Sequence, residues 1–132
     1  MKGSYILIIQ VEKDTCIRVG ALGSLDFSAG YYAYTGSALN SLESRISRHL
    51  SDNKKIFWHV DYLLLISKVV GVWTIISDKR LECSSAARYA SLTASVKGFG
   101  SSDCRCRSHL FFSQEQERLE DIAHSLEYKC VK

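Results

Sequence analysis

The sequence predicts an α+β fold in which a small, mainly antiparallel sheet is flanked by helices. Strand-like runs come first along the chain, and helix-like and strand-like segments alternate afterwards, an order typical of this class. At 132 residues the chain has the length of one domain. It contains no internal repeat and no linker-like stretch, so we assign residues 1–132 to a single domain.

The first strands are expected in the N-terminal third of the chain. Residues 5–11 (YILIIQV) are rich in the β-branched and aromatic types that strands favour. Residues 16–20 could form the second arm of a hairpin that turns near residues 13–14. A further strand is predicted at residues 31–34 (YYAY), and it ends at residues 35–37 (TGS).

The first helix is expected to begin at Asn40, whose side chain could cap it together with Glu43 three residues later. Apolar residues at four-residue spacing predict its buried stripe: Leu42, Ile46 and Leu50. Arg45 and His49 are also four residues apart, on a different face, so both side chains can reach one point in space.

The rest of the chain is expected to alternate between helix and strand. We predict a helix at 57–66, a strand at 68–77, a helix at 79–94, a strand at 110–112 and a helix at 115–129. A polar loop is expected at 51–55, and a loop rich in glycine and serine at 96–109.

The chain is mildly basic, with a formal net charge of +3, which permits a nucleic acid as partner without requiring one. Its N-terminal apolar run is short and soon reaches charged residues, unlike that of a signal peptide. No apolar stretch approaches the roughly 20 residues that span a membrane. We therefore expect a cytoplasmic protein with no membrane association.

Two tyrosine-containing motifs, an arginine and a glutamate follow one another along the chain. GSY at 3–5 opens the first predicted strand, and YTG at 34–36, which ends on Gly36, closes another. Later helices supply Arg45 and Glu82. This order resembles that of the GIY-YIG nuclease superfamily.

Two later segments make the resemblance more particular: WHVDY at 58–62 and GFGSSDCRC at 98–106. Together they are similar to the DUF123 branch of this superfamily, and the resemblance spans nearly the whole chain. It implies a Mg²⁺- or Mn²⁺-dependent endonuclease that acts on nucleic acid, with DNA as the expected substrate and a DNA repair enzyme as an implied partner. The interval between Tyr5 and Tyr34 is longer than the family's usual gap, which predicts an extended hairpin.

The resemblance also implies roles for individual residues. Tyr5 would be the general base if its pKa were depressed, and Tyr34 would orient the attacking water. Arg45 would bind two oxygens of the phosphate, since its guanidinium is planar and always charged. Glu82 would hold a Mg²⁺ ion, which acts as a Lewis acid and lowers the pKa of bound water.

Other interpretations remain open. Each tyrosine alone fits packing in a strand, Arg45 alone a solvated helix surface, and Glu82 alone a favourable charge near a helix start. His49 could neutralise phosphate or act as a general acid, or it could have no role in the site. The family's late asparagine has no clear equivalent, although residues 101–102 or Asp103 could occupy its place. A catalytically inactive nucleic-acid-binding module is therefore the alternative function.

His59 and Asp61 could form a charge pair or a metal site if their segment were a strand. On a helix, residues two apart do not face each other. A histidine that is hydrogen-bonded under the core is the alternative to a role in the site.

Three cysteines and a histidine suggest a zinc site: Cys83, Cys104, Cys106 and His109. Their Cys-x-Cys-x-x-His spacing differs from the usual C-x₂-C, so inert buried cysteines are an alternative. A third interpretation places Cys104 in the active site beside Glu82. The zinc interpretation predicts a zinc-stabilised interaction domain.

Several basic residues could form a rim around the predicted site beside Arg45: Arg48, Lys54, Lys55, Arg105 and Arg107. Phosphate contacts of this type give affinity that does not depend on nucleic-acid sequence. Solvated surface charges are the alternative.

Overall fold

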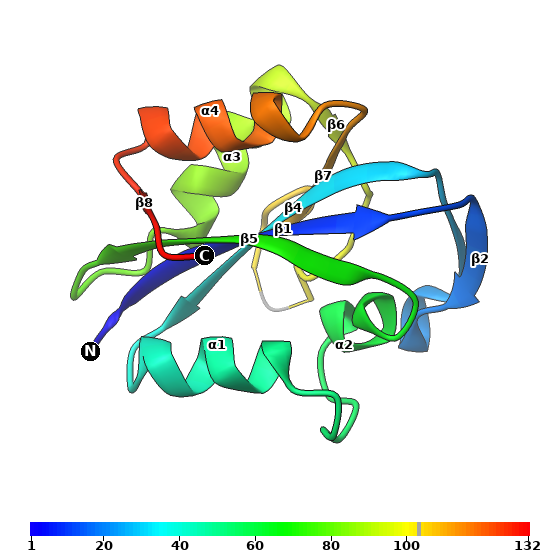
Figure 1. The fold of residues 1–132 in the computed structure, drawn as a ribbon, viewed down its shortest axis with the longest axis horizontal. Coiled ribbons are helices and arrows are strands. Elements are labelled where there is room, and N and C mark those ends of the chain that lie inside the picture. The colour runs from blue at the N-terminus through cyan, green and yellow to red at the C-terminus, as the bar shows by residue number, and fades with distance from the viewer. Residues whose placement is uncertain (103) are drawn as a thin grey trace.

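A computed structural model describes residues 1–102 and 104–132 and shows one six-stranded antiparallel sheet with the strand order β6-β7-β4-β1-β5-β8 (Figure 1). Its strands are β1 (Gly3–Val11), β4 (Gly30–Ala38), β5 (Lys68–Ile76), β6 (Ala94–Ser95), β7 (Leu110–Ser113) and β8 (Lys129–Cys130). A two-stranded sheet comprises β2 (Thr15–Arg18) and β3 (Ser24–Phe27). The helices are α1 (Leu42–Leu50), α2 (His59–Leu64), α3 (Glu82–Leu92) and α4 (Gln116–Ser125), with a short 3₁₀ helix at Gly20–Leu22. The predicted α+β class is confirmed.

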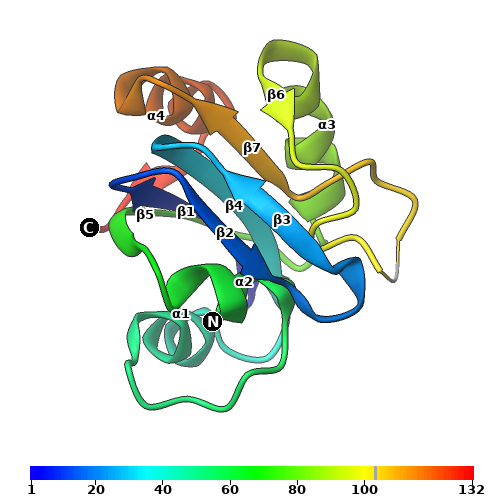
Figure 2. The same cartoon turned by 90° about the vertical axis from the view of Figure 1, so that its right-hand side faces the viewer.

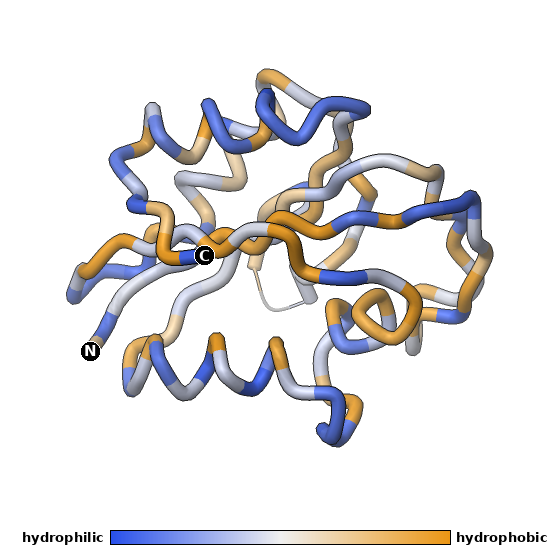
Figure 3. Tube along the Cα trace, in the orientation of Figure 1, coloured by the Kyte–Doolittle hydropathy of each residue, from blue (hydrophilic) through white to orange (hydrophobic). Residues whose placement is uncertain are grey.

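Helices cover both faces of the six-stranded sheet, with α1 and α2 on one side and α3 and α4 on the other (Figure 1). Alternate side chains of β1 therefore enter two separate cores. Tyr5 and Leu7 belong to the core under α1 and α2, whereas Ile6 and Ile8 belong to the core under α3 and α4. A strand that is covered on both faces needs apolar residues at nearly every position. Figure 3 shows this pattern as apolar colour along the sheet and hydrophilic colour on the outer turns of α4.

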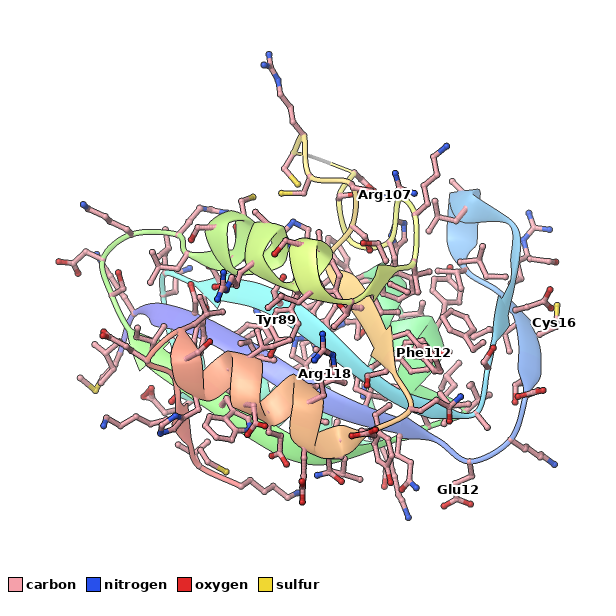
Figure 4. The ribbon with its side chains drawn as sticks, turned by 90° about the horizontal axis from the view of Figure 1, so that it is seen from above. Glu12, Cys16, Tyr89, Arg107, Phe112 and Arg118 are labelled. Atoms are coloured by element: carbon pink, nitrogen blue, oxygen red, sulfur yellow. The ribbon has the colours of Figure 1, made fainter. Side chains whose placement is uncertain are left out.

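Tyr89 anchors α3 to the rest of its layer. Its ring stacks on Phe111 of β7 with the centroids 5.5 Å apart, and its hydroxyl donates to the carbonyl oxygen of Leu119 in α4 at 2.7 Å. Figure 4 shows Tyr89 between the two helices and the sheet. Because this contact is fully buried, it fixes the position of α3, whose first residue is Glu82.

The hairpin near the N-terminus differs from the prediction. Residues 16–20 were expected to pair with the first strand, but β2 pairs with β3 instead (Figure 2). The reason is that both edges of β1 are already occupied, one by β4 and the other by β5. The β2–β3 ribbon fills the long interval between Tyr5 and Tyr34, so the extended hairpin is confirmed.

The start of α1 and its buried face also need correction. The N-cap is Ser41, whose hydroxyl oxygen accepts from the amide of Ser44 at 3.1 Å, and not Asn40. Leu42 and His49 are buried, whereas Leu50 is 37% exposed. Residues seven apart lie on nearly the same side of an α-helix, because 3.6 residues make one turn. The buried face therefore includes His49 and leaves Leu50 at its margin.

The last helix is shorter than the predicted 115–129. It ends at Ser125, and Glu127 takes a left-handed conformation with φ of 70°. The chain then turns so that β8 pairs with β5. Among the described residues, no helix is long and apolar enough to cross a membrane.

Candidate functional site

A pocket of about 820 Å³ lies at one end of the sheet, between α1 and the start of α3. It brings together predicted site residues from the strands β1 and β4, the helices α1 and α3, and the β6–β7 loop: Tyr5, Tyr34, Gly36, Arg45, Arg48, Glu82, Cys83, Cys104 and His109. Other predicted residues do not line this pocket: His49, Lys54, Lys55, His59, Asp61, Arg105 and Arg107. Asp103 lies outside the residues that the structure describes.

The two tyrosines lie side by side at the floor of the pocket. Tyr5 and Tyr34 come from the paired strands β1 and β4, and their ring centroids are 6.4 Å apart. Tyr5 is paired in register with Gly36, where a Cβ atom would come within 2.5 Å of the Tyr5 hydroxyl oxygen. Only glycine leaves room for the phenol at this position, which explains why the YTG motif ends on glycine.

A buried hydrogen bond joins Tyr5 to His49. The Tyr5 hydroxyl oxygen lies 2.7 Å from Nε2 of the imidazole, and both side chains are almost fully buried. His49 Nδ1 has no hydrogen-bond partner among the described residues. Although His49 is outside the pocket lining, this bond connects it directly to a pocket residue. Sequence spacing predicted that His49 lies near Arg45, but it did not predict the contact with Tyr5.

Burial determines the protonation of these groups. It raises the pKa of Tyr5 to about 12, and the nearby Arg45 charge only partly offsets that effect. Burial likewise raises the pKa of Tyr34 well above its ordinary value and lowers the pKa of His49 to about 4. A tyrosine general base requires a depressed pKa, and burial of Tyr5 has the opposite effect. At neutral pH both phenols and the imidazole are uncharged.

Two arginines stack on one indole ring at the wall of the pocket. The guanidinium carbons of Arg45 and Arg48 lie 4.6 and 4.3 Å from the centroid of Trp58. Arg45 also donates through Nη1 to the carbonyl oxygen of Ser37 at 3.0 Å. These contacts restrict both long side chains, so both guanidinium groups are held against the pocket wall.

Asp61 has a structural role that the sequence did not reveal. Its two carboxylate oxygens each accept from Arg48 at 3.0 Å, and Oδ2 also accepts from the amides of Phe57 and Trp58 at 2.8 Å. Burial opposes ionisation, but Arg48 and the two amides outweigh it and lower the pKa of Asp61. The carboxylate therefore caps α2 and holds Arg48 in place, and it does not line the pocket.

His59 and Asp61 have different hydrogen-bond partners, because residues two apart on a helix point in different directions. His59 Nδ1 accepts from the amide of Gly100 at 2.8 Å, and its ring packs against Phe99. Burial lowers the pKa of His59. It thus positions the β6–β7 loop, on which Gly100 lies against Tyr34.

Glu82 is the carboxylate that lines the pocket among the described residues. It is the first residue of α3, its side chain is 17% exposed, and Arg80 Nη1 lies 3.7 Å away. The preceding amide, that of Leu81, donates to the hydroxyl oxygen of Ser4 at 3.0 Å, which ties the start of α3 to β1. A single carboxylate of this kind suits Mg²⁺, a hard cation that keeps most of its waters.

Three thiols and an imidazole form a second group beside Glu82, called here the Cys₃His cluster: Cys83, Cys104, Cys106 and His109. Their sulfur and nitrogen atoms all lie within 4.8 Å of one another, so the group could hold a metal ion. Burial raises the pKa of the Cys83 thiol, and burial with the neighbouring thiols raises that of Cys106 to about 12. The described cysteines form no disulfide.

The predicted basic rim is only partly assembled. Arg48 lines the pocket, but Lys54 donates to the carbonyl oxygens of His49 and Ser51 at the end of α1. Three other members of the rim are exposed outside the pocket: Lys55, Arg105 and Arg107. Figure 4 shows Arg107 on the loop that precedes β7.

Some pocket residues were missed by sequence reasoning. Trp58 supports both arginines, Arg80 adds a third positive side chain, and Ser41 caps α1 at the pocket edge. Ser41 could have been found from the sequence, because it directly follows Asn40 and serine is an equally favoured N-cap. Nothing in the local pattern of Trp58 or Arg80 indicates which way the side chain points.

The family model described as "Domain of unknown function DUF123" matches residues 4–131. No curated protein and no solved structure matches the chain.

Proposed function

Since this chain belongs to the DUF123 family, whose description assigns no function, we propose an activity from the pocket: metal-dependent hydrolysis of a phosphodiester in nucleic acid, as in GIY-YIG endonucleases. DNA is the proposed substrate, and a DNA repair enzyme is a proposed partner. One observation carries the proposal. Tyr5, Arg45 and Glu82, which lie far apart in the sequence, line a single pocket. Together they supply a proton-transfer group, a phosphate ligand and a metal ligand.

Recognition of phosphate is proposed for Arg45. Its guanidinium is stacked on Trp58 and anchored to Ser37, so it is held in place before a ligand arrives. A guanidinium can donate to two phosphate oxygens at once. Arg48 is bound to Asp61 through both carboxylate oxygens, so its charge is largely balanced and its role is to support Trp58 rather than to follow the phosphate.

Glu82 is the proposed ligand for Mg²⁺ or Mn²⁺. Bound there, the ion would neutralise charge on the phosphoryl oxygens and lower the pKa of a bound water. The thiols next to Glu82 suit a softer ion, because sulfur ligands favour zinc over magnesium. Glu82 alone is therefore assigned to the hard cation.

Proton transfer is proposed for Tyr5 together with His49. With its pKa near 12, Tyr5 is not ionised at neutral pH and cannot act as a phenolate. It can take a proton from the attacking water while its own proton passes to His49 Nε2 across the 2.7 Å hydrogen bond. The two transfers leave Tyr5 neutral and His49 protonated. Tyr34, beside Tyr5, would orient the water.

A second function, binding of nucleic acid without cleavage, is favoured by one observation. Glu82 is a lone carboxylate in the pocket as far as the described residues go, and it already lies near Arg80. With no further acidic ligand the affinity for a divalent cation would be low. The arginines and Trp58 would still bind the phosphate backbone and bases of a nucleic acid.

The test is cleavage of labelled single-stranded, duplex and branched DNA, and of RNA, with Mg²⁺, Mn²⁺ or EDTA. The parent protein should cut only with metal, and Arg45→Ala and Glu82→Ala should abolish cutting while the circular dichroism spectrum stays unchanged. Arg18→Ala and Glu12→Ala are matched controls, because both side chains are exposed and neither lines the pocket. Both controls should cut like the parent.

Each outcome separates the alternatives. Cutting that survives in Arg45→Ala or Glu82→Ala would contradict the assignment of the site. Binding without cutting on every substrate, weakened by Arg45→Ala, would favour the binding module. Neither binding nor cutting would reject both functions.

A further inference from the structure

Two segments that are distant in the sequence supply the Cys₃His cluster. Cys83 lies in the first turn of α3, and the other three ligands lie in the loop between β6 and β7. Four ligand atoms of the types that zinc prefers lie within 4.8 Å of one another, and only Cys106 also packs against an apolar core. We propose that the Cys₃His cluster binds one Zn²⁺ ion in a closed, structural site.

The spacing of the ligand atoms is close to that of a zinc tetrahedron. With Zn–S near 2.3 Å, the ligand atoms of a tetrahedral site are roughly 3.5–3.8 Å apart. His109 Nε2 lies 3.2 Å from Cys104 Sγ and 3.9 Å from Cys83 Sγ. Small rotations of the side chains would therefore centre an ion among the four atoms. Four protein ligands leave no open coordination position, which is typical of a structural site.

The surroundings of His109 support its orientation as a ligand. Its Nδ1 lies 2.7 Å from the hydroxyl oxygen of Thr35, in a buried contact. Its backbone is fixed as well, because its amide donates to Phe99 and its carbonyl accepts from Thr35. Histidine ligands of metals usually donate their second ring nitrogen to an oxygen in this way. When Nδ1–H donates to Thr35, the lone pair of Nε2 points toward the thiols.

The proposed ion would connect the zinc site to the wall of the pocket. Cys83 directly follows Glu82, and Cys104 itself lines the pocket. On the same loop, a Cβ at Gly100 would come within 3.2 Å of the Tyr34 ring. A zinc ion would therefore hold the loop against the start of α3 and keep Glu82 and Tyr34 at fixed places. This role needs no nuclease activity.

Metal content is the direct test. The full chain is purified in reducing buffer without chelator, dialysed, and analysed for metals by mass spectrometry. We expect about one zinc per chain, reduced at least fivefold in Cys106→Ser and in Cys83→Ser. Cys16→Ser and Cys130→Ser are the matched controls, because both thiols are exposed and lie outside the cluster. Figure 4 shows Cys16 on the β2–β3 ribbon, away from the loop that carries Arg107. Both controls should keep the full zinc content.

A second measurement covers the case in which the cluster variants fail to fold. Parent protein is stripped of metal and titrated with Co²⁺, which should give the intense visible absorption of tetrahedral cobalt–thiolate, reversed by one equivalent of Zn²⁺. A parent protein that holds no stoichiometric zinc and gives no such absorption would overturn the proposal. So would zinc that is lost equally in Cys16→Ser, or iron in place of zinc. Neither readout depends on cleavage, so failure of the proposed function would leave this result intact.

Discussion

The Tyr5 hydroxyl oxygen lies 2.7 Å from His49 Nε2, and this hydrogen bond joins the central strand to the first helix beneath the pocket. Both groups are buried and both are neutral at physiological pH, because burial raises the pKa of the phenol and lowers that of the imidazole. The bond thus serves the fold, by pairing two buried polar groups, and the proposed chemistry, by offering a path for a proton.

Tyr5→Phe tests the two roles of this bond together. It keeps the ring that packs under Gly36 but leaves His49 Nε2 without its partner, which should lower the free energy of unfolding by about 1–3 kcal/mol. Loss of a proton-transfer group should slow any cleavage by roughly 100-fold or more. Urea denaturation and single-turnover cleavage measure the two effects. Cleavage at the parent rate would exclude Tyr5 from the chemistry.

Stability should fall as the solution is acidified below neutral pH. His49 has a pKa of about 4 in the folded chain and near 6.5 when unfolded, so between these values only the unfolded chain binds the proton. The free energy of unfolding should therefore decrease by up to about 1.4 kcal/mol per pH unit from 6.5 down to 4. His59, whose pKa burial also lowers, adds a slope of the same sign. Asp61, with its lowered pKa, loses its contribution at still lower pH.

His49→Gln separates these contributions. It removes the titrating group while keeping an amide in reach of Tyr5. The slope of unfolding free energy against pH should become shallower between 6.5 and 4, measured by urea denaturation at each pH. If the unfolding free energy of this variant depended on pH as steeply as that of the parent, the lowered pKa of His49 would not be the cause of the slope.

Asp61→Asn should be strongly destabilising. The substitution removes the charge that holds Arg48 and leaves only one oxygen for the amides that cap α2. Since Asp61 is fully buried, we expect a loss of about 2–4 kcal/mol in urea denaturation. Glu12→Gln is the control, because the Glu12–Lys68 pair is exposed and should contribute less than about 1 kcal/mol. Equal effects of the two substitutions would contradict this difference.

Gly36→Ala should displace the Tyr5 ring. The added methyl group would come within 2.5 Å of the phenol, so the ring or the strand must move, at a cost of about 1–3 kcal/mol. We expect the proposed cleavage, or the binding of DNA, to fall well beyond what the stability loss explains. Gly71→Ala is the control: it crowds Ile8 and Glu120 on the opposite face of the sheet. It should lower stability while leaving activity unchanged at temperatures where both variants are folded.

Much of the fold could be predicted from local patterns. The first strand and the strand at 68–77 were found because both segments are rich in the β-branched and aromatic residues that strands favour. The cap of α1 was misplaced by one residue, since Asn40 and Ser41 are both good caps and only the path of the chain decides between them. The pairing of residues 16–20 was missed because it depends on which strand edges remain open.

The sequence predicted which residues form the candidate site but not the distances and contacts between them. The order of the motifs placed Tyr5, Arg45 and Glu82 together, and the structure brings them to one pocket. The sequence could not show that burial raises the pKa of Tyr5, because burial depends on every segment that packs around the phenol. Asp61 was considered for a site and instead caps a helix, which its own spacing could not reveal.

The order and local composition of the segments were sufficient to determine the α+β class, the first strand and the common side of α1 that carries Arg45 and His49. The last of these follows from the fixed repeat of side chains along a helix. Only the tertiary structure decided that His49 meets Tyr5, and that Cys83 meets three ligands from a distant loop. Such contacts join segments that are far apart in the chain, and their distances depend on how whole layers pack against each other.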